Sequence, residues 1–330
     1  MESETRREEQ PDYSIVIPVY NSAGMLEQLI AELHTELQGR SYEVVLVNDG
    51  SPDNSWDVLQ KLAAEHSHLT VIDLIRNYGQ HSAMFCGFQH ARGRYVITMD
   101  DDLQNPPSQV PLLIDKVEEG FDVVFGRFPQ KQHGLVRKLG SRIVGWLNRK
   151  LFGKPADVVL SNFRIIRREI VDAICETRTA FPYIPGMLLL TGRSFGNVDV
   201  EHHPRRSGSS GYGVAAIASL VWRIIFNYSA LPLRWACFTG IAVSVVSFLI
   251  GLFFLVKALL VGTVSPGFPT LVCLLAFCNG VTLLVLSLLS EYIVRVVNEV
   301  SGIPAFRIRS SIQASDASAA GSAVKGGSDG

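Results

Sequence analysis

Strand-like and helix-like patterns alternate along this chain between residue 13 and about residue 130. Short apolar runs rich in β-branched residues predict buried strands at residues 14–19, 42–47, 69–74 and 95–98. Segments with helical periodicity lie between them, at residues 25–37, 55–65 and 82–91. This alternation predicts an α/β fold, in which a mostly parallel sheet is covered by helices on both faces. Ligands of such sheets bind beyond the carboxyl ends of the strands.

Polar residues follow each of the four predicted strands. The strands end at Tyr20-Asn21, at Asn48-Asp49-Gly50-Ser51, near Arg76-Asn77-Tyr78-Gly79, and at Asp100-Asp101-Asp102. Each end alone has an ordinary structural explanation, because Asp49-Gly50 is a common turn and Asn77 or Gln80 can cap the next helix. Four polar strand ends in succession favour a shared binding rim instead.

Three adjacent carboxylates follow the fourth predicted strand. Charges this close raise one another's pKa unless a cation or hydrogen-bond donors hold the charged forms. In an extended segment Asp100 and Asp102 point to the same side and Asp101 faces away, and Gln104 adds a third oxygen. Oxygen ligands without nearby His or Cys suit Mg²⁺ or Mn²⁺, which share their shell with substrate phosphates. The alternative is an acidic turn that caps a helix and binds no metal.

Two uncharged apolar runs, residues 236–256 and 268–290, are each about long enough to cross a hydrocarbon core. They predict transmembrane helices over residues 235–261 and 268–290. Arginines lie on both flanks of this region, Arg205, Arg206, Arg223 and Arg234 before it and Arg295, Arg307 and Arg309 after it. The positive-inside rule therefore predicts a membrane protein with its large N-terminal part and both termini in the cytoplasm.

The remaining boundaries follow from composition. Residues 1–12 and 310–330 read as disordered tails, and residues 13–204 as the cytoplasmic domain. Residues 205–234 read as interfacial or juxtamembrane helices, although the part at 214–228 could instead pack in a core. Residues 291–309 are expected to be a cytoplasmic juxtamembrane segment. The net charge of -1 argues against a nucleic-acid binder.

The motifs "IPVYN", "VNDGSPDNS", "RNYGQHSA" and "MDDDLQNPP", followed by two apolar runs, carry a resemblance to a known family. Residues 13–309 resemble the family 2 glycosyltransferases that load sugars onto polyprenyl phosphates. They are most similar to the bacterial undecaprenyl-phosphate 4-deoxy-4-formamido-L-arabinose transferase type. Dolichyl-phosphate mannose synthases and bactoprenol glucosyltransferases are more distant relatives. The resemblance implies a GT-A type nucleotide-diphospho-sugar transferase domain.

The resemblance also implies an activity: inverting transfer of a sugar from a nucleotide-sugar, with a UDP-sugar favoured, to a polyprenyl phosphate at the membrane. By resemblance, Asp100, Asp102 and Gln104 hold Mg²⁺ or Mn²⁺, and Asp100, Asp102, Arg127 and Arg137 form the catalytic set. The implied nucleotide site comprises Pro18, Tyr20, Asn21, Asp49, Asn77, Gln80, Asp100 and Asp101, with Asp49 on the base edge. The implied contacts to the acceptor phosphate are Arg137, Arg205 and Arg206. The basic loop at residues 128–138 either closes over substrate or is an ordinary solvated loop.

Some positions depart from the family pattern. Ser22 stands where relatives often have Glu, Asn162 where many have Asp, and Gly211 where they have Lys. A carboxylate sometimes proposed as a base is therefore absent at residue 162. A polyprenyl phosphate is already an anion near neutral pH, so its oxygen can attack without a general base.

Two other functions compete with this one. A processive polysaccharide synthase shares the nucleotide-binding half, but it has more spans and a Gln-x-x-Arg-Trp motif, whereas Arg234-Trp235 occurs here without that Gln. A non-catalytic membrane scaffold with a relic nucleotide pocket has no need to keep the Asp100 and Asp102 pair. Relatives assemble through their membrane helices, so a homo-oligomer, with a tetramer favoured, is also expected.

Overall fold

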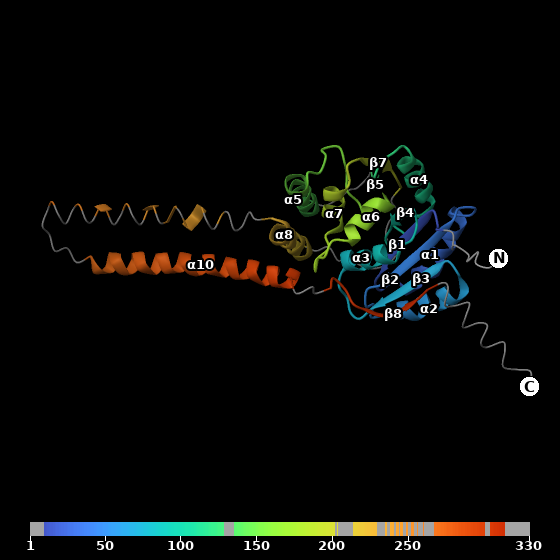
Figure 1. Cartoon of the computed structure of the whole chain (residues 1–330), viewed down its shortest axis with the longest axis horizontal. Helices are drawn as coiled ribbons and strands as arrows, with labels where there is room; N and C mark the ends of the chain where they lie inside the picture. The colour runs from blue at the N-terminus through green and yellow to red at the C-terminus, as the bar shows by residue number, and fades with distance from the viewer. Residues whose placement is uncertain are drawn as a thin grey trace, which may run out of the picture. The chain divides into compact units, whose positions relative to one another are not determined.

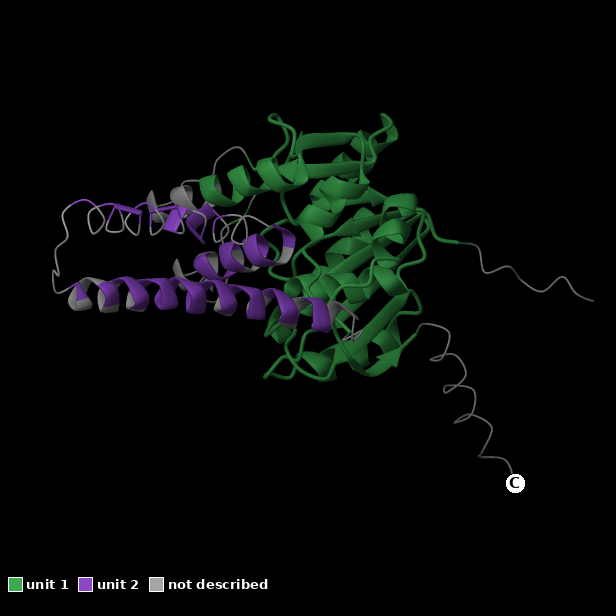
Figure 2. Cartoon of the chain, turned by 60° about the vertical axis from the view of Figure 1, so that its left-hand side comes forward, with its two compact units in different colours: residues 1–213, 302–330 green, residues 214–301 purple. Residues whose placement is uncertain are grey.

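The computed structural model describes residues 10–128, 135–201, 203, 214–229, 267–300 and 304–313, together with single residues and short groups between 235 and 260. Contacts between Cα atoms divide the chain into two compact units (Figure 2). Unit 1 comprises residues 1–213 and 302–330, and unit 2 comprises residues 214–301.

Unit 1 is built around an eight-stranded sheet (Figure 1). Its strands lie in the order β7-β5-β6-β4-β1-β2-β3-β8. Their bounds are β1 Tyr13–Val19, β2 Tyr42–Asn48, β3 Leu69–Leu74, β4 Tyr95–Thr98, β5 Val123–Arg127, β6 Arg164–Arg167, β7 Phe195–Asp199 and β8 Ile308–Ile312. The four strands predicted from sequence form the central parallel block, in which β1 pairs with both β2 and β4 and β2 pairs with β3. The prediction of a mostly parallel α/β sheet is confirmed.

Helices cover both faces of the sheet because alternate strand residues point to opposite sides. Ile15 and Ile17 of β1 belong to a core that includes apolar residues of α1 (Ala23–Glu36), α2 (Ser55–Glu65) and α4 (Val110–Glu118). Val16 belongs to the opposite core, with residues of α3 (Gln80–His90), α6 (Arg168–Cys175) and α7 (Ile184–Thr191). The unit also contains a short 3-10 helix, η1 Pro107–Gln109, and α5 (Leu135–Phe152).

The strand order reverses between β1 and β4. The chain moves from β1 to β2 to β3 in one direction and then places β4 on the other side of β1. The loops that follow β1 and β4 leave adjacent strands at this reversal, on the carboxyl-end rim where ligands of open α/β sheets bind. Residues 20–22 and 100–104 therefore meet at the switch point of this sheet.

Ordered structure reaches into both segments predicted as disordered tails, residues 1–12 and 310–330. Residues 310–312 belong to β8, which pairs antiparallel with β3, so the chain stays ordered beyond the predicted boundary at residue 310. At the other end, the Arg94 N–H donates to the Pro11 carbonyl and the Tyr95 N–H donates to the Asp12 carbonyl. Long-range strand pairing decides these boundaries, and local composition does not report it.

Unit 2 contains α8 (Val214–Tyr228) and α10 (Phe268–Val300), and the described residues between 235 and 260 are helical. The Tyr292 hydroxyl donates to the Ser229 carbonyl at 2.9 Å, and the Phe226 and Tyr292 rings lie 6.3 Å apart. α10 therefore packs against the end of α8. The second predicted span, residues 268–290, lies within α10, which runs on to Val300.

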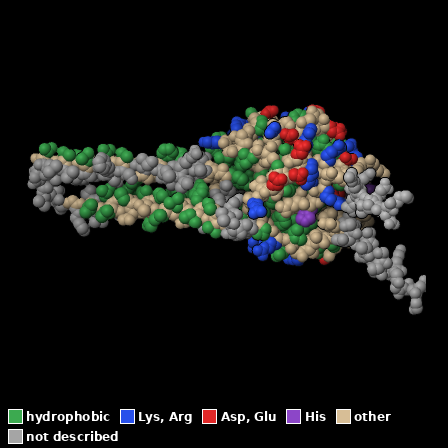
Figure 3. Space-filling view, viewed as in Figure 1, with side chains coloured by type: hydrophobic (Ala, Val, Ile, Leu, Met, Phe, Trp, Pro, Cys, Tyr) green, Lys and Arg blue, Asp and Glu red, His purple; other side chains and the backbone are tan. Residues whose placement is uncertain are grey.

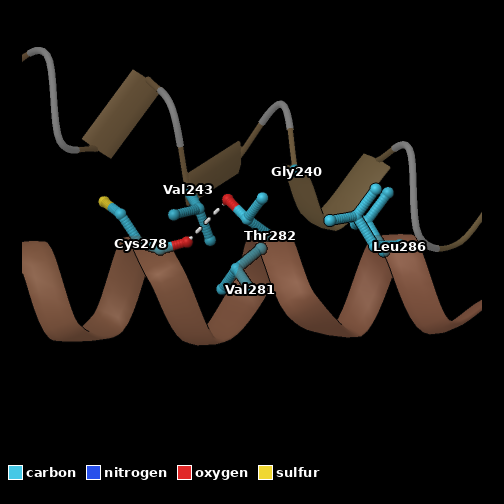
Figure 4. A pocket seen from close by; sticks show the side chains of 7 residues that line it. Gly240, Val243, Cys278, Val281, Thr282 and Leu286 are labelled. Atoms are coloured by element: carbon cyan, nitrogen blue, oxygen red, sulfur yellow. Dashed lines mark hydrogen bonds between the residues drawn. The ribbon is translucent and has the colours of Figure 1, made fainter.

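A small pocket lies between α10 and the described residues near 240 (Figure 4). It is lined by Gly240, Val243, Cys278, Val281, Thr282, Val285 and Leu286. The Thr282 hydroxyl donates back to the Cys278 carbonyl at 2.9 Å, so this hydroxyl is satisfied within its own helix.

Hydrophobic side chains gather along unit 2, whereas acidic and basic side chains gather over unit 1 (Figure 3). Among the described residues of α10, Leu271, Phe277, Leu283 and Ile293 are each more than half exposed. Over the part of the chain that the structure describes, no helix has both the length and the apolar character needed to cross a membrane. Much of the first predicted span lies outside those residues.

Candidate active site

The loops after β1 and β4 are joined directly at the switch point. The Tyr20 N–H donates to Asp101 Oδ2 at 3.0 Å, and burial raises the pKa of the Asp101 carboxyl. Asn21 has a φ of 56°, in the left-handed region that Asn tolerates better than most residues. Its N–H donates to the Ser51 hydroxyl at 3.1 Å, which ties the first strand end to the second.

Asp49 connects the ends of β2 and β3. Its two carboxylate oxygens accept hydrogen bonds from the Tyr78 N–H at 2.7 Å and the Gly79 N–H at 2.8 Å. Burial raises the pKa of Asp49 to about 6, and the two N–H donors act in the opposite direction. The structure thus gives Asp49 a role in holding the loop at residues 75–79. The predicted contact between Asp49 and the edge of the nucleotide's base is not tested by this geometry and stays a prediction.

The loops after β2 and β3 also touch through their backbones. Gly50 has a φ of 63°, and a Cβ atom built there would lie 2.5 Å from the Arg76 carbonyl carbon. Only glycine fits this position without moving the neighbouring loop. Asn77 lies exposed in that loop, and Gln80 begins α3 directly after it.

The three adjacent aspartates have different surroundings. Asp100 accepts a hydrogen bond from Gln80 Nε2 at 2.5 Å, and its pKa is raised to about 6 by burial first and then by the charges of Asp102 and Asp101. Asp102 is buried, and its Oδ1 accepts from the Gln104 N–H at 3.2 Å. The Gln104 carbonyl in turn accepts from the His203 N–H at 2.9 Å. That bond draws the segment before Arg205 to the Asp-rich loop.

A buried arginine lies next to the end of β4. Arg164 pairs in register with Thr98 and is fully buried. Its terminal nitrogens donate to the Ser161 carbonyl and to Met84 Sδ, and its Nε has no partner among the described residues. Burial lowers the pKa of Arg164 to about 10, against the opposing effect of the Asp100 charge. Arg164 therefore supplies fixed positive charge behind Asp100.

His81 belongs to the same buried group. Its ring lies edge-on to Tyr183 with centroids 5.4 Å apart, and its Nδ1 is buried without a partner among the described residues. Burial and the Arg164 charge lower the pKa of His81 to about 4, so the ring is neutral at physiological pH. Sequence reasoning missed the roles of Arg164 and His81. The signal available was a charged residue directly between Phe163 and Ile165 in an apolar run.

The structure describes only some of the basic residues predicted for the site. Arg127 ends β5 and forms a two-bond ion pair with Asp199 of β7, at 2.5 and 3.0 Å, and this pair lowers the pKa of Asp199. Pro18 is buried near the end of β1. Arg137 lies in the first turn of α5, and its side chain is outside the described residues. Arg205, Arg206 and residues 129–134 of the predicted loop also lie outside them.

The oxygen donors at the switch point fit a hard divalent cation. Asp100 and Asp102 are carboxylates on one short loop, and the raised pKa of Asp100 means that a cation nearby would stabilise its charged form. Within the described residues, no group of three or more His, Cys, Asp or Glu side chains is arranged to hold a metal ion by itself. With two carboxylate ligands, most of the ion's coordination shell would be filled by water and diphosphate oxygens, as is usual for Mg²⁺.

Comparison with known proteins places this geometry in a family. Residues 14–175 match glycosyl transferase family 2. The undecaprenyl-phosphate 4-deoxy-4-formamido-L-arabinose transferase of Shewanella sediminis is 35% identical over 302 residues, which cover 90% of this chain and 91% of the relative. The enzyme of the same name from Proteus mirabilis is 35% identical over 301 residues, covering 90% and 92%.

Solved structures share the fold. Glucosyl-3-phosphoglycerate synthase from Mycobacterium tuberculosis, solved with Mn²⁺, UDP and phosphoglyceric acid, superimposes with a TM-score of 0.51 at 19% identity. The match covers 66% of this chain and 76% of that one. The match of residues 14–175 to the family, the similarity along nine-tenths of the sequence and the acidic pair at the switch point lead to one assignment. This chain is a glycosyltransferase that belongs to glycosyl transferase family 2.

Proposed function

We propose that this enzyme transfers a sugar from a nucleoside-diphosphate sugar, with a UDP-sugar favoured, to undecaprenyl phosphate or a related polyprenyl phosphate. The observation that carries the proposal is the extent of the similarity. Relatives named as undecaprenyl-phosphate transferases match this chain over 90% of its length, well beyond the family 2 domain at residues 14–175. The C-terminal third is therefore part of what is shared.

The rim formed by the carboxyl ends of β1 to β4 is the proposed site of the nucleoside diphosphate. Asp49 holds the loop at residues 75–79 in place, and Gln80 holds the Asp100 carboxylate. Pro18, Tyr20, Asn21, Asn77 and Asp101 complete the proposed nucleotide site. The carboxylates of Asp49, Asp100 and Asp101 are held by hydrogen bonds from neighbouring loops before substrate arrives, which lowers the cost of binding.

Asp100 and Asp102, with Gln104, would hold the divalent ion. Bound there, Mg²⁺ or Mn²⁺ would neutralise charge on the departing nucleoside diphosphate. The fold neighbour solved with Mn²⁺ and UDP supports this choice of cofactor. Arg164 lies behind Asp100 and limits the repulsion between the adjacent carboxylates.

The acceptor requires cations more than it requires a base. A phosphate monoester is ionised near neutral pH, so its oxygen can attack the anomeric carbon in a single inverting displacement. Two anionic groups must then be held within bonding distance, and Arg127, Arg137, Arg205 and Arg206 are the proposed partners. Arg127 would have to exchange part of its pairing with Asp199 for a phosphate.

We place the reaction at the cytoplasmic face of the bacterial inner membrane. The uncharged runs at residues 236–256 and 268–290 would provide two transmembrane helices beside a lipid-borne acceptor. The chain topology supports an even number of crossings. β8 follows unit 2 in sequence and pairs with β3, so both ends of residues 214–301 join the same sheet-containing unit. Assembly into a homo-oligomer, with a tetramer favoured, is part of this proposal.

The activity can be tested directly with purified full-length protein, Mn²⁺, undecaprenyl phosphate and a panel of labelled UDP-, GDP- and dTDP-sugars. We expect a lipid monophosphate sugar from one donor and none without divalent ion. A polymeric product would instead indicate a processive synthase. No product and no thermal stabilisation by any nucleotide would indicate a scaffold.

A further inference from the structure

The C-terminal strand brings an arginine to the edge of the sheet next to the nucleotide loops. β8 pairs antiparallel with β3 (Figure 1), in a register that matches Asp73 with Ser310 and Leu74 with Ile308. Arg309 is left over between these pairs, in a β-bulge. Bulges re-aim the side chain of the extra residue. Here the Arg309 guanidinium lies over the end of β3.

Arg309 makes two contacts at that strand end. Its Nη1 lies 3.1 Å from Asp73 Oδ2, and its Nη2 donates to the Ile75 carbonyl at 2.8 Å. Asp73 is 1% exposed, so its carboxylate depends on such partners for compensation of its charge. The Ile75 N–H also donates to the Arg307 carbonyl at 3.0 Å. Arg309 of β8 and Arg307, just before that strand, thus hold the first residue of the loop at 75–79.

Hydrogen bonds also connect Asp73 to Asn48, the last residue of β2. Asn48 Nδ2 donates to Asp73 Oδ1 at 2.7 Å, and both residues are buried. The Asn48 side-chain oxygen accepts from the Ser51 N–H at 3.3 Å. The Ser51 hydroxyl accepts from the Asn21 N–H. A continuous set of hydrogen bonds therefore joins Arg309 to the loop after β1.

The loop at residues 75–79 is consequently held from two sides. Asp49 and Gly50 contact it from the β2 end, and Arg309 with the Arg307 carbonyl contacts it from the β8 side. We propose that Arg309 is a positioning residue for nucleotide binding, which acts through Asp73 and Asn48 on the loops that form the donor site. The inference rests on the proposed function, because it assumes that these loops bind the nucleoside diphosphate.

The test measures UDP binding directly and then compares the donor and acceptor KM values in turnover assays. Full-length protein in detergent is titrated with UDP in the presence of Mn²⁺, and wild type is compared with Arg309→Met, Arg309→Lys and Arg307→Met. Arg307 is an exposed neighbour on the same segment whose backbone carbonyl, not its side chain, contacts the loop. Arg307→Met therefore removes one positive charge without removing the contacts to Asp73.

We expect Arg309→Met to weaken UDP binding by about 5- to 20-fold, the range expected for loss of a charge-assisted hydrogen-bond network. Arg309→Lys should weaken it less, because an ammonium can keep the Asp73 pair while losing the second bond. Arg307→Met should stay within about twofold of wild type. In turnover assays the donor KM should rise while the acceptor KM stays unchanged, a split that a general loss of stability would not produce.

Each outcome bears on the inference. Equal UDP affinity of Arg309→Met and wild type, with both folded, overturns it, as does an equal loss in Arg307→Met. If Arg309→Met fails to fold, a fourth variant, Arg309→Gln, decides. It removes the positive charge that faces Asp73, so wild-type UDP affinity and wild-type donor KM in that variant overturn the inference. If wild type itself binds no UDP or other nucleotide, the proposed function fails, and the inference fails with it.

Discussion

Asp49 shows how one side chain can serve two loops. Its carboxylate is almost fully buried yet accepts two backbone hydrogen bonds, so the cost of burial and the gain from the donors oppose each other. Burial has the larger effect, since it raises the pKa of the Asp49 carboxyl from 3.8 to about 6. The ionised Asp49 carboxylate therefore lowers the stability of the folded state relative to the protonated form. Asp49 lies where the nucleotide is expected to bind.

This raised pKa predicts a pH-dependent contribution to stability. The folded state binds the Asp49 proton more tightly than the unfolded state, so the stabilisation is complete below about pH 4 and is lost as pH rises through about 6. Asp49→Asn removes the titration. The unfolding free energy of wild type minus that of Asp49→Asn should therefore fall between pH 4 and 6 and level off above about pH 7. Urea denaturation across this range measures it, and a flat difference contradicts the assignment.

Asp102 is the sharpest test of the metal site. It is a buried carboxylate on the loop after β4, and replacing it with Asn keeps the shape and removes the charge. Asp102→Asn should lower turnover by at least ~10²-fold if the side chain binds the metal ion directly. Asp115→Asn, on the exposed side of α4, provides a matched control. Unchanged turnover and unchanged Mn²⁺ affinity in Asp102→Asn would remove Asp102 from the metal site.

At the scale of elements, the proposed donor site depends on loops whose backbones contact one another. Gly50 is the contact point between the loops after β2 and β3, and Asn21 N–H, Ser51 and Asp101 join the loops after β1, β2 and β4. These loops follow adjacent parallel strands, so their spacing is set by the sheet. A side chain added at the contact point must therefore displace a loop.

Gly50→Ala tests this contact against a matched glycine. Gly39 also has a positive φ, 82°, but a Cβ there would meet nothing within 4 Å. Both substitutions carry the backbone penalty of about 1–2 kcal/mol. Gly50→Ala should cost at least ~1 kcal/mol more and should weaken UDP binding, because the loop at residues 75–79 has to move. Chemical denaturation and UDP titration of both variants check this. Equal losses in the two variants would show that the contact has no effect.

At the scale of the whole molecule, the chain leaves unit 1 after residue 213 and returns to it at residue 302. The returning segment is anchored by Phe306, whose ring lies 6.4 Å from that of Phe85, and by the pairing of β8 with β3. The catalytic unit is therefore completed by residues that follow unit 2. A chain truncated before residue 304 would lack one edge strand of its sheet.

Membrane attachment can be checked by fractionation. We expect the full chain to stay with the membrane fraction after high-salt and alkaline washes, because two long uncharged apolar runs would lie in the hydrocarbon. Val245→Lys combined with Leu249→Lys should weaken this retention, because each charge near the bilayer centre costs roughly 2.5–3.5 kcal/mol. Release of the wild-type chain by the alkaline wash would contradict the proposal.

Periodicity in the sequence was enough to predict the central block of the fold. β1 to β4, their intervening helices and the polar strand ends follow from apolar alternation and turn residues, which act over a few neighbouring positions. The antiparallel pairings were not predicted. β6 pairs with β4, and β8 pairs with β3, from which more than half of the chain separates it. Neither pairing produces a pattern in the local sequence.

The candidate site divides in the same way. The sequence by itself determined which oxygens and nitrogens are available, because residue types carry their chemistry wherever they lie: Asp100 and Asp102, Asp49, Tyr20 and Asn21. Only the tertiary structure decided how these groups are used. It turned Asp49 toward the loop at 75–79, buried Arg164 behind Asp100, and brought Arg309 to Asp73 from 236 residues away. Such contacts depend on strand register and burial, which arise only when distant segments pack together.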